Sequence, residues 1–181
     1  MDDTHSITAR SKTRVDNILA DLEQQYGSFE VVKKRWERSE VAFDRLLTQF
    51  EQGRLDGAGV WITNDDGEVL LVRNEGEDGW ADPGGKVEVG EEYATAAKRE
   101  VREETGIDCT LTGLRELHKI ENITASHPAS IFEVIAVFDG EYVDGAVRAK
   151  DGEIADIGWF SVPPSTVLYE EVRQRPYPAQ T

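Results

Sequence analysis

Three glutamates in one short run constrain this chain more than any other feature. Glu100, Glu103 and Glu104 stand at positions i, i+3 and i+4 of a stretch, 91–104, that has helical spacing and is followed by a stop at Gly106. On a helix these carboxylates leave one face together, and like charges at this spacing destabilise the helix unless a counter-ion lies between them. The pattern predicts either a solvated acidic face or a site for a divalent cation that prefers oxygen ligands, such as Mg²⁺ or Mn²⁺.

A glycine pair ahead of this helix favours the metal site. Gly84 and Gly85 allow the backbone to approach a ligand closely, and a free carbonyl there can add another oxygen ligand. Lys86 follows and can contact phosphate oxygens. Such a turn and helix suit a metal ion that bridges the protein and a diphosphate, where the ion lowers the pKa of an attacking water.

The complete pattern resembles the Nudix signature. Gly85, five residues, Glu91, seven residues and then REVREETGI (99–107) match G-x5-E-x7-R-E-U-x-E-E-x-G-U at every fixed position, U being a bulky aliphatic residue. The lead-in, 80–85, is also similar to that of many members, except that Asp82 stands where an aliphatic residue is commoner.

Resemblance to this family implies an α/β fold, a mixed-sheet α/β/α sandwich. It also implies a metal-dependent hydrolase that cleaves a diphosphate linkage in a nucleoside diphosphate or triphosphate derivative. The expected partner is a small-molecule nucleotide substrate, the expected cofactor Mg²⁺ or Mn²⁺, and the reaction an attack of water at phosphorus.

The resemblance assigns roles within the signature. Glu103, Glu104 and the carbonyl of Gly85 are implied metal ligands, and Glu100 is a third ligand or the general base that takes a proton from the water. The resemblance also implies that Arg99 and Glu91 form an ion pair between the loop and the helix. It implies that Gly106 is the helix C-cap.

Outside the signature, the residue types give further candidates for substrate binding. Arg73 ends an expected strand just before the substrate loop, although a surface arginine is equally common there. Trp61 or Trp80 can stack on a nucleobase, although a tryptophan more often packs in a core or loop. Glu133 and Glu153 are candidate extra carboxylates. The substrate-binding set is then Arg73, Trp80, Lys86, Glu133 and Glu153. We assign no role to the lone histidines His118 and His127.

Residues 1–55 differ from the remainder in charge and period. They hold ten acidic and nine basic residues, whereas residues 56–181 hold 26 acidic and 11 basic ones. Apolar spacing predicts a helix that ends at Gly27, and the same period from Phe29 to Phe50 predicts a second long helix or two shorter ones. We therefore expect a helical hairpin ahead of a catalytic domain, and these helices are a candidate surface for a homodimer.

From residue 56 the pattern changes to short β-branched runs. An Asn64-Asp65-Asp66-Gly67 turn joins the first two in a hairpin. The predicted strands are 58–63, 69–73, 110–117, 131–138 and 154–160. After the prolines Pro163 and Pro164, a short closing helix is predicted over 165–173.

Composition limits the partners. The net charge of −16 and the pI near 4.5 disfavour nucleic acid and anionic membranes. The basic run 33–38 is interpreted as the solvated face of a helix.

No stretch is long and apolar enough to span a bilayer, and the start lacks the parts of a signal peptide, so we expect a cytoplasmic protein. The acidic excess is typical of organisms with high internal salt, and we expect stability to rise with salt.

Two other functions use the same features. A nucleotide-binding regulator without turnover would not need all three helix glutamates, and an isoprenoid diphosphate isomerase would need a second cysteine-containing motif that is not found here. The intact signature favours turnover. Residues 122–124, Asn-Ile-Thr, support neither an ADP-ribose nor a dinucleoside polyphosphate preference. The sequence does not identify the group that is attached to the diphosphate.

Overall fold

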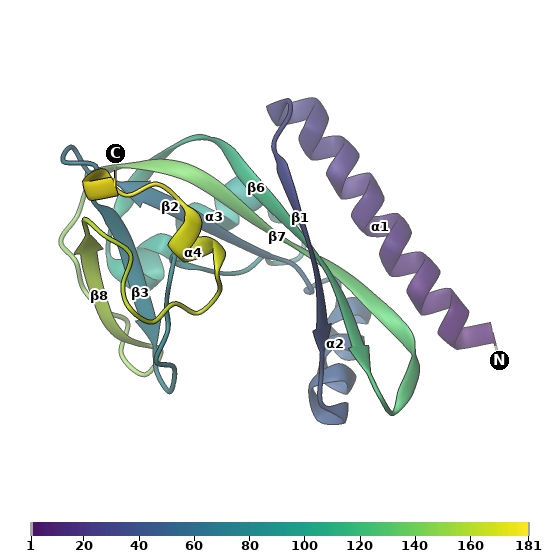
Figure 1. Ribbon diagram of the computed structural model, residues 1–181. Helices are drawn as coiled ribbons and strands as arrows, with labels where there is room; N and C mark the ends of the chain where they lie inside the picture. The colour runs from purple at the N-terminus through teal and green to yellow at the C-terminus, as the bar shows by residue number, and fades with distance from the viewer. Residues whose placement is uncertain (1, 181) are drawn as a thin grey trace.

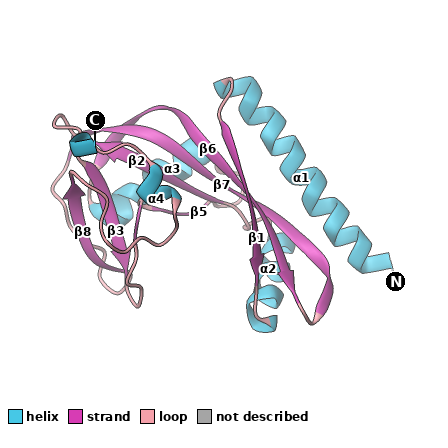
Figure 2. Cartoon of the chain, viewed as in Figure 1, coloured by secondary structure: helices cyan, strands magenta, loops and turns pink. Residues whose placement is uncertain are grey.

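The computed structural model describes residues 2–180, which form one mixed β-sheet with helices on both of its faces (Figures 1 and 2). The mixed α/β class implied by the sequence is confirmed. The elements in chain order are α1 Asp2–Tyr26, β1 Glu30–Glu37, α2 Glu40–Gln52, β2 Gly57–Thr63, β3 Val69–Asn74, β4 Trp80–Ala81, β5 Gly84–Lys86, α3 Tyr93–Thr105, β6 Asp108–Thr124, β7 His127–Asp144, β8 Ile154–Phe160, α4 Glu171–Gln174 and η1 Pro178–Gln180.

The sheet runs in the order β1-β6-β7-β2-β3-β4, with β5 paired to β2 and β8 paired to β3. Its central feature is the long antiparallel hairpin of β6 and β7, which extends well beyond the other strands in Figure 2. Parallel pairs, β1 with β6 and β2 with β7, attach the segments that precede and follow α2 to this hairpin. The hairpin therefore carries β1 on one edge and the strands from β2 to β4 on the other.

Residues 30–37 form a strand where the apolar spacing predicts a helix. Val32 and Trp36 lie at helical spacing, but the segment pairs in parallel with residues 116–123 of β6. A short apolar run is ambiguous between the two structures, and the unpaired edge of β6 supplies hydrogen-bond partners that decide in favour of the strand. The helix predicted to end at Gly27 is present as α1, and the later part of the second predicted helix is present as α2. Because β1 lies between them, the helical hairpin predicted for residues 1–55 is wrong. So is the interpretation of residues 33–38 as the solvated face of a helix.

Hydrophobic side chains cover both faces of the sheet, because neighbouring strand residues point to opposite sides. On β2, Val60 and Ile62 face one cluster with α1 and α3, whereas Trp61 faces another with Val172 of α4. Figure 1 shows α3 behind the sheet and α4 in front of it. The closing helix predicted over 165–173 is largely wrong, since the helix there is α4 alone.

A buried carboxylate connects three of these elements. Asp56, 6% exposed, accepts hydrogen bonds from both Nη atoms of Arg14 on α1, at 2.6 and 2.9 Å. It also accepts from the Tyr93 hydroxyl of α3 at 2.6 Å and from the Val134 N–H of β7 at 3.1 Å. Burial and the neighbouring Asp56 carboxylate raise the pKa of Tyr93, so its hydroxyl stays a donor. These bonds position α1 and the start of α3 against the sheet.

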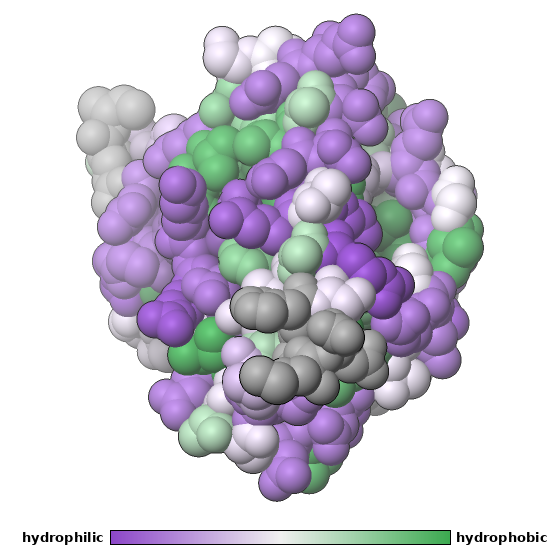
Figure 3. Space-filling view, turned by 90° about the vertical axis from the view of Figure 1, so that its right-hand side faces the viewer, coloured by the Kyte–Doolittle hydropathy of each residue, from purple (hydrophilic) through white to green (hydrophobic). Residues whose placement is uncertain are grey.

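The α1 side of the molecule is mostly hydrophilic, with hydrophobic groups between the polar side chains (Figure 3). Among the described residues, no helix combines the length and apolar character that crossing a membrane requires.

Candidate active site

Helix α3 presents the three glutamates in three different environments. Its inner face is apolar, with Ala97 and Val101 fully buried, and it ends where Gly106 takes a left-handed φ of 74° and donates its N–H to the Arg102 carbonyl. The side chain of Glu103 is 45% exposed, whereas that of Glu100 is 12% exposed and Glu104 is 4% exposed. The exposure of the three carboxylates therefore decreases from Glu103 through Glu100 to Glu104.

Arg99 joins the loop before α3 to its glutamates. Its guanidinium donates to both carboxylate oxygens of Glu91, at 2.8 and 3.0 Å, so the pair expected from the sequence is present and bidentate. Nη1 also donates to Glu100 at 2.9 Å and to Glu103 at 3.2 Å, and Nη2 to the Lys86 carbonyl at 2.9 Å. The hydrogen bond from Arg99 lowers the pKa of Glu91.

The glycine pair lies directly against these carboxylates. A Cβ on Gly85 would lie 2.5 Å from the carboxyl carbon of Glu100, and one on Gly84 would lie 2.5 Å from the Ala58 carbonyl oxygen. The Gly84 N–H donates to the Glu104 carboxylate at 3.1 Å. A side chain at Gly84 would clash with backbone atoms, and one at Gly85 would displace the Glu100 carboxylate, so the backbone of β5 itself forms the wall of the site.

Burial, together with the nearby carboxylates of Glu100, Glu153 and Asp82, raises the pKa of Glu104 to about 8, although the hydrogen bond from the Gly84 N–H lowers it. Glu153 reaches this site from the loop before β8 and forms an ion pair with Lys150 at 2.6 Å. Carboxyl groups are therefore crowded around Glu104, which makes its ionised form unfavourable without a counter-ion.

The chemistry of these carboxylates suits a hard divalent cation, because all of them offer oxygen ligands and the buried ones repel one another. Within residues 2–180, no three acidic, imidazole or thiol groups are gathered at ligand distance, and Arg99 lies between Glu100 and Glu103 instead. The side chain of Glu103 is 45% exposed, so packing does not fix it in this position.

A cleft of about 290 Å³ opens beside this cluster at Gly84 and Gly85. Its floor is the sheet face that carries Glu133, Ile135 and Val137 on β7. Lys86 lines the rim, and its Nζ donates to the Leu55 carbonyl at 3.2 Å. Of the residues predicted to bind substrate, Lys86 and Glu133 thus lie in the cleft.

Strand β1 and the loop before α4 close the far side of the cleft. Lys34 and Trp36 line it from β1, and Tyr169 lines it from the loop. The Lys34 ammonium lies 5.0 Å from the Tyr169 ring centroid and forms an ion pair with Glu171 at 2.8 Å. These residues were not predicted from the sequence, although the alternation of Lys34, Trp36 and Arg38 fits a strand as well as a helix.

Below the cleft, a buried arginine explains the unusual Asp82. Arg175, 5% exposed, donates to Asp82 at 2.8 Å, to the Tyr169 hydroxyl at 3.0 Å and to Glu116 from Nε at 2.7 Å and from Nη2. Burial alone would raise the pKa of Glu116, but His118 and Arg175 outweigh it and lower that pKa to about 2. Asp82 is therefore one of two carboxylates that hold a buried cation.

A family model described as the NUDIX domain matches residues 53–177, more than half of the chain. This chain belongs to the Nudix family. The matched region begins within the loop after α2 and contains the complete Nudix box, 85–107, together with the cleft floor. It excludes β1, which contributes Lys34 and Trp36.

Relatives of this Nudix protein match parts of their own lengths. An RNA pyrophosphohydrolase of Halorhodospira halophila is 49% identical over 49 residues, 27% of this chain and 27% of that protein. A putative 8-oxo-dGTP diphosphatase of Bacillus subtilis is 32% identical over 108 residues, 58% of this chain and 65% of that protein. The chain therefore spans less than two thirds of these curated relatives.

Solved structures share the fold. A UDP-X diphosphatase structure has a TM-score of 0.50 at 24% identity, over 89% of this chain and 73% of its own. A Nudix hydrolase from Nitrosomonas europaea has a TM-score of 0.52 at 17% identity, over 66% of this chain and 65% of its own. At these identities the likeness concerns the fold alone.

Three residues predicted or considered for substrate contact lie away from the Nudix cleft. Trp61 is 2% exposed and packs edge-on against Tyr177, so it is a core residue. The Trp80 ring packs against Phe160 at 4.8 Å between centroids, and Arg73 donates to the Glu77 carbonyl at 3.2 Å. The substrate roles predicted for Arg73 and Trp80 do not match these positions, because neither residue lines the cleft.

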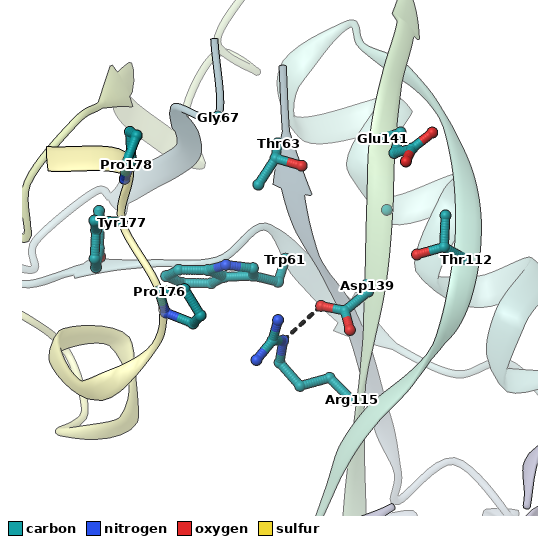
Figure 4. A pocket seen from close by; sticks show the side chains of 11 residues that line it. Trp61, Thr63, Gly67, Thr112, Arg115, Asp139, Glu141, Pro176, Tyr177 and Pro178 are labelled. Atoms are coloured by element: carbon teal, nitrogen blue, oxygen red, sulfur yellow. Dashed lines mark hydrogen bonds and ion pairs between the residues drawn. The ribbon is translucent and has the colours of Figure 1, made fainter. Parts of the chain in front are cut away.

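A second cavity, of about 340 Å³, lies beside Trp61 and the C-terminal residues (Figure 4). Arg115 and Asp139 face each other there in an ion pair at 2.5 Å, and Pro176 and Pro178 form its rim. No residue of the Nudix box lines this cavity. We therefore place the candidate active site in the cleft at Gly84 and Gly85.

Proposed function

We propose that this Nudix protein is a metal-dependent hydrolase that cleaves a diphosphate linkage in a nucleoside diphosphate or triphosphate derivative. The observation that carries the proposal is the carboxylate cluster around Glu104, which repels itself and adjoins a cleft at Gly84 and Gly85. Relatives named as a pyrophosphohydrolase and a diphosphatase support the same reaction class.

The ligands proposed for a divalent cation, Mg²⁺ or Mn²⁺, are Glu103, Glu104 and the Gly85 carbonyl. When bound, the ion neutralises phosphate charge and lowers the pKa of a water molecule. Glu100 is then a further ligand, or it accepts the proton of the water that attacks phosphorus. Arg99 orients Glu100 through the 2.9 Å bond and fixes the loop through Glu91. Glu153 is a second carboxylate beside Glu104 that can take the base role.

The diphosphate is proposed to lie along the backbone of Gly84 and Gly85, with the Lys86 ammonium at the rim to contact its oxygens. The linked group then enters the cleft and meets Trp36 and Tyr169, whose rings offer apolar faces with polar edges. Both aromatic residues come from outside the Nudix box. Selection of the linked group is therefore proposed to reside in β1 and the loop before α4.

The test compares the wild type with Glu103→Gln and Glu104→Gln on a panel of nucleoside diphosphate and triphosphate derivatives with Mg²⁺. Outer-shell residues of metal sites typically contribute about 10- to 100-fold, so loss of a direct ligand should lower kcat/KM by roughly 100-fold or more. Glu37→Gln, on an exposed position at the end of β1, is the matched control and should retain activity.

Two results would redirect the proposal. Near-wild-type turnover by both Glu103→Gln and Glu104→Gln would show that the ligand roles are wrong. A wild type that binds nucleotides in calorimetry but hydrolyses none of the panel would favour a nucleotide-binding regulator.

A further inference from the structure

A third cavity, of about 220 Å³, lies between α2 and the end of β1 and is lined by an excess of cations. We call it the cationic cavity and define it by Arg38, Arg45, Lys86, Gln49 and Glu133. Three positive side chains around one carboxylate are unexpected in a chain whose net charge is −16. Such a concentration of positive charge indicates a site for an anion.

The fold brings these cations together from three separate elements. Arg38 follows β1 on the same side as Trp36, and its guanidinium lies 4.6 Å from the Trp36 ring centroid. Arg45 and Gln49 stand one turn apart on α2, so they lie on the same side of that helix. Lys86 ends β5, and its ammonium donates to the Gln49 side chain of α2 at 3.5 Å and to the Leu55 carbonyl in the loop after α2 at 3.2 Å.

The positive charge of this cavity is only partly neutralised from within. Arg38 donates to Asn122 at 2.7 Å and lies 3.9 Å from Glu133, which is 5% exposed. Lys86 has backbone and amide oxygens as its partners. Among the residues that the structure describes, Arg45 has no carboxylate within ion-pair distance and is exposed. Two guanidinium groups and an ammonium can therefore receive an anion from the open side.

This cavity adjoins the proposed substrate cleft, because Lys86 and Glu133 line both. Its volume of about 220 Å³ accommodates a tetrahedral anion with several waters, since one water occupies roughly 30 Å³ in the liquid. Paired arginines favour phosphate in particular, because the planar guanidinium donates to two phosphate oxygens at once.

We propose that the cationic cavity binds a phosphoryl group other than the diphosphate that is cleaved. The source is either a phosphate monoester on the substrate's linked group or free inorganic phosphate. The substrate source rests on the proposed function, whereas the phosphate site itself does not. Arg38 and Arg45 are the residues that carry it, and neither belongs to the Nudix box.

Direct binding tests the site independently of turnover. Inorganic phosphate is titrated into the full chain by calorimetry, with Arg38→Gln, Arg45→Gln and Arg35→Gln as variants. Arg35 is the matched control, since it removes the same charge from the opposite face of β1, where it pairs with Glu121 at 3.6 Å. Both Arg38→Gln and Arg45→Gln should weaken phosphate binding at least tenfold, and Arg35→Gln should change it less than twofold. Arg45 is exposed, so its loss should leave the thermal midpoint unchanged even if Arg38→Gln lowers it.

A kinetic comparison distinguishes the two sources. The wild type and the same three variants are assayed for hydrolysis of NADPH and NADH, two dinucleotides that differ by one phosphate monoester. If the monoester occupies the cavity, KM for NADPH is at least tenfold lower in the wild type, the difference disappears in Arg45→Gln, and inorganic phosphate competes with NADPH alone. If free phosphate is the ligand, the two KM values agree, while phosphate binding still depends on Arg45.

The proposal is overturned if phosphate binding is undetectable or equal in the wild type, Arg45→Gln and Arg35→Gln, and the KM ratio of the dinucleotides is the same in all three. Absence of turnover on every substrate, with phosphate binding that still requires Arg45, would reject the proposed function and retain the phosphate site. The two failures are therefore separable.

Discussion

Replacing Gly85 with alanine should disturb the Nudix carboxylates through one methyl group. The new Cβ would lie 2.5 Å from the Cδ and Oε2 atoms of Glu100 and 2.9 Å from its Oε1. Those distances are about 1 Å short of ordinary contact between carbon atoms, so the Glu100 carboxylate must move by roughly that amount. Overpacking of this kind costs about 1–3 kcal/mol, and a misplacement of about 1 Å at a reacting group lowers turnover by roughly 100-fold.

Urea unfolding and steady-state kinetics of Gly85→Ala measure both effects. Gly113→Ala is the control, because a Cβ there meets nothing within 4 Å. It should be neutral or slightly stabilising, since glycine in a strand costs about 0.5–1 kcal/mol relative to alanine. Adding Glu100→Asp shortens the side chain that clashes, so the double variant should regain part of the lost stability without regaining activity. If Gly85→Ala matches Gly113→Ala in stability and kcat/KM, the close packing of β5 on Glu100 has no consequence and the reasoning is refuted.

Two further predictions concern pH and salt. The pKa of Glu116 in the folded protein is about 2, below its ordinary value of 4.5, so this group stabilises the fold above about pH 4.5 and loses that effect as pH falls toward 2. The free energy of unfolding of the wild type should therefore drop over that interval by on the order of 2 kcal/mol more than that of Glu116→Gln, measured by urea titration; equal slopes would contradict the assignment. The net charge of −16 predicts a thermal midpoint that rises from 0.1 M to molar KCl, as screening shortens the Debye length from about 10 Å to about 3 Å; a midpoint independent of salt would show that self-repulsion is unimportant.

Local spacing made the box predictable from sequence. Helix α3, its glycine stop and the Arg99–Glu91 pair lie within 22 residues of Gly85, and helical geometry alone relates their side chains. The hairpin at Asn64–Gly67 is equally local, and its strands are found at the predicted places. Contacts over such distances depend little on the remainder of the chain.

The cleft was not predictable, because its walls meet through long-range contacts. β1 takes strand geometry from its pairing with β6, which lies 86 residues further along, as Glu30 with Glu116 shows. Asp82 receives its partner, Arg175, from 93 residues away. No pattern within residues 29–50 separates a strand from a helix, since Trp36 and Val32 fit both periods.

The parallel pairing of β1 with β6 also sets an order of events during synthesis. Residues 30–37 leave the ribosome before residues 116–123 exist, and Glu171, which anchors Lys34, follows 137 residues after it. Because domains form as the chain emerges and distant contacts close last, β1 must wait with its backbone unpaired until the β6–β7 hairpin has folded. Nascent chains arrested near residue 110 would contain the whole Nudix box but lack the cleft. The residues proposed to bind the metal are thus made early, and the cleft proposed to select a substrate is completed only near the end of translation.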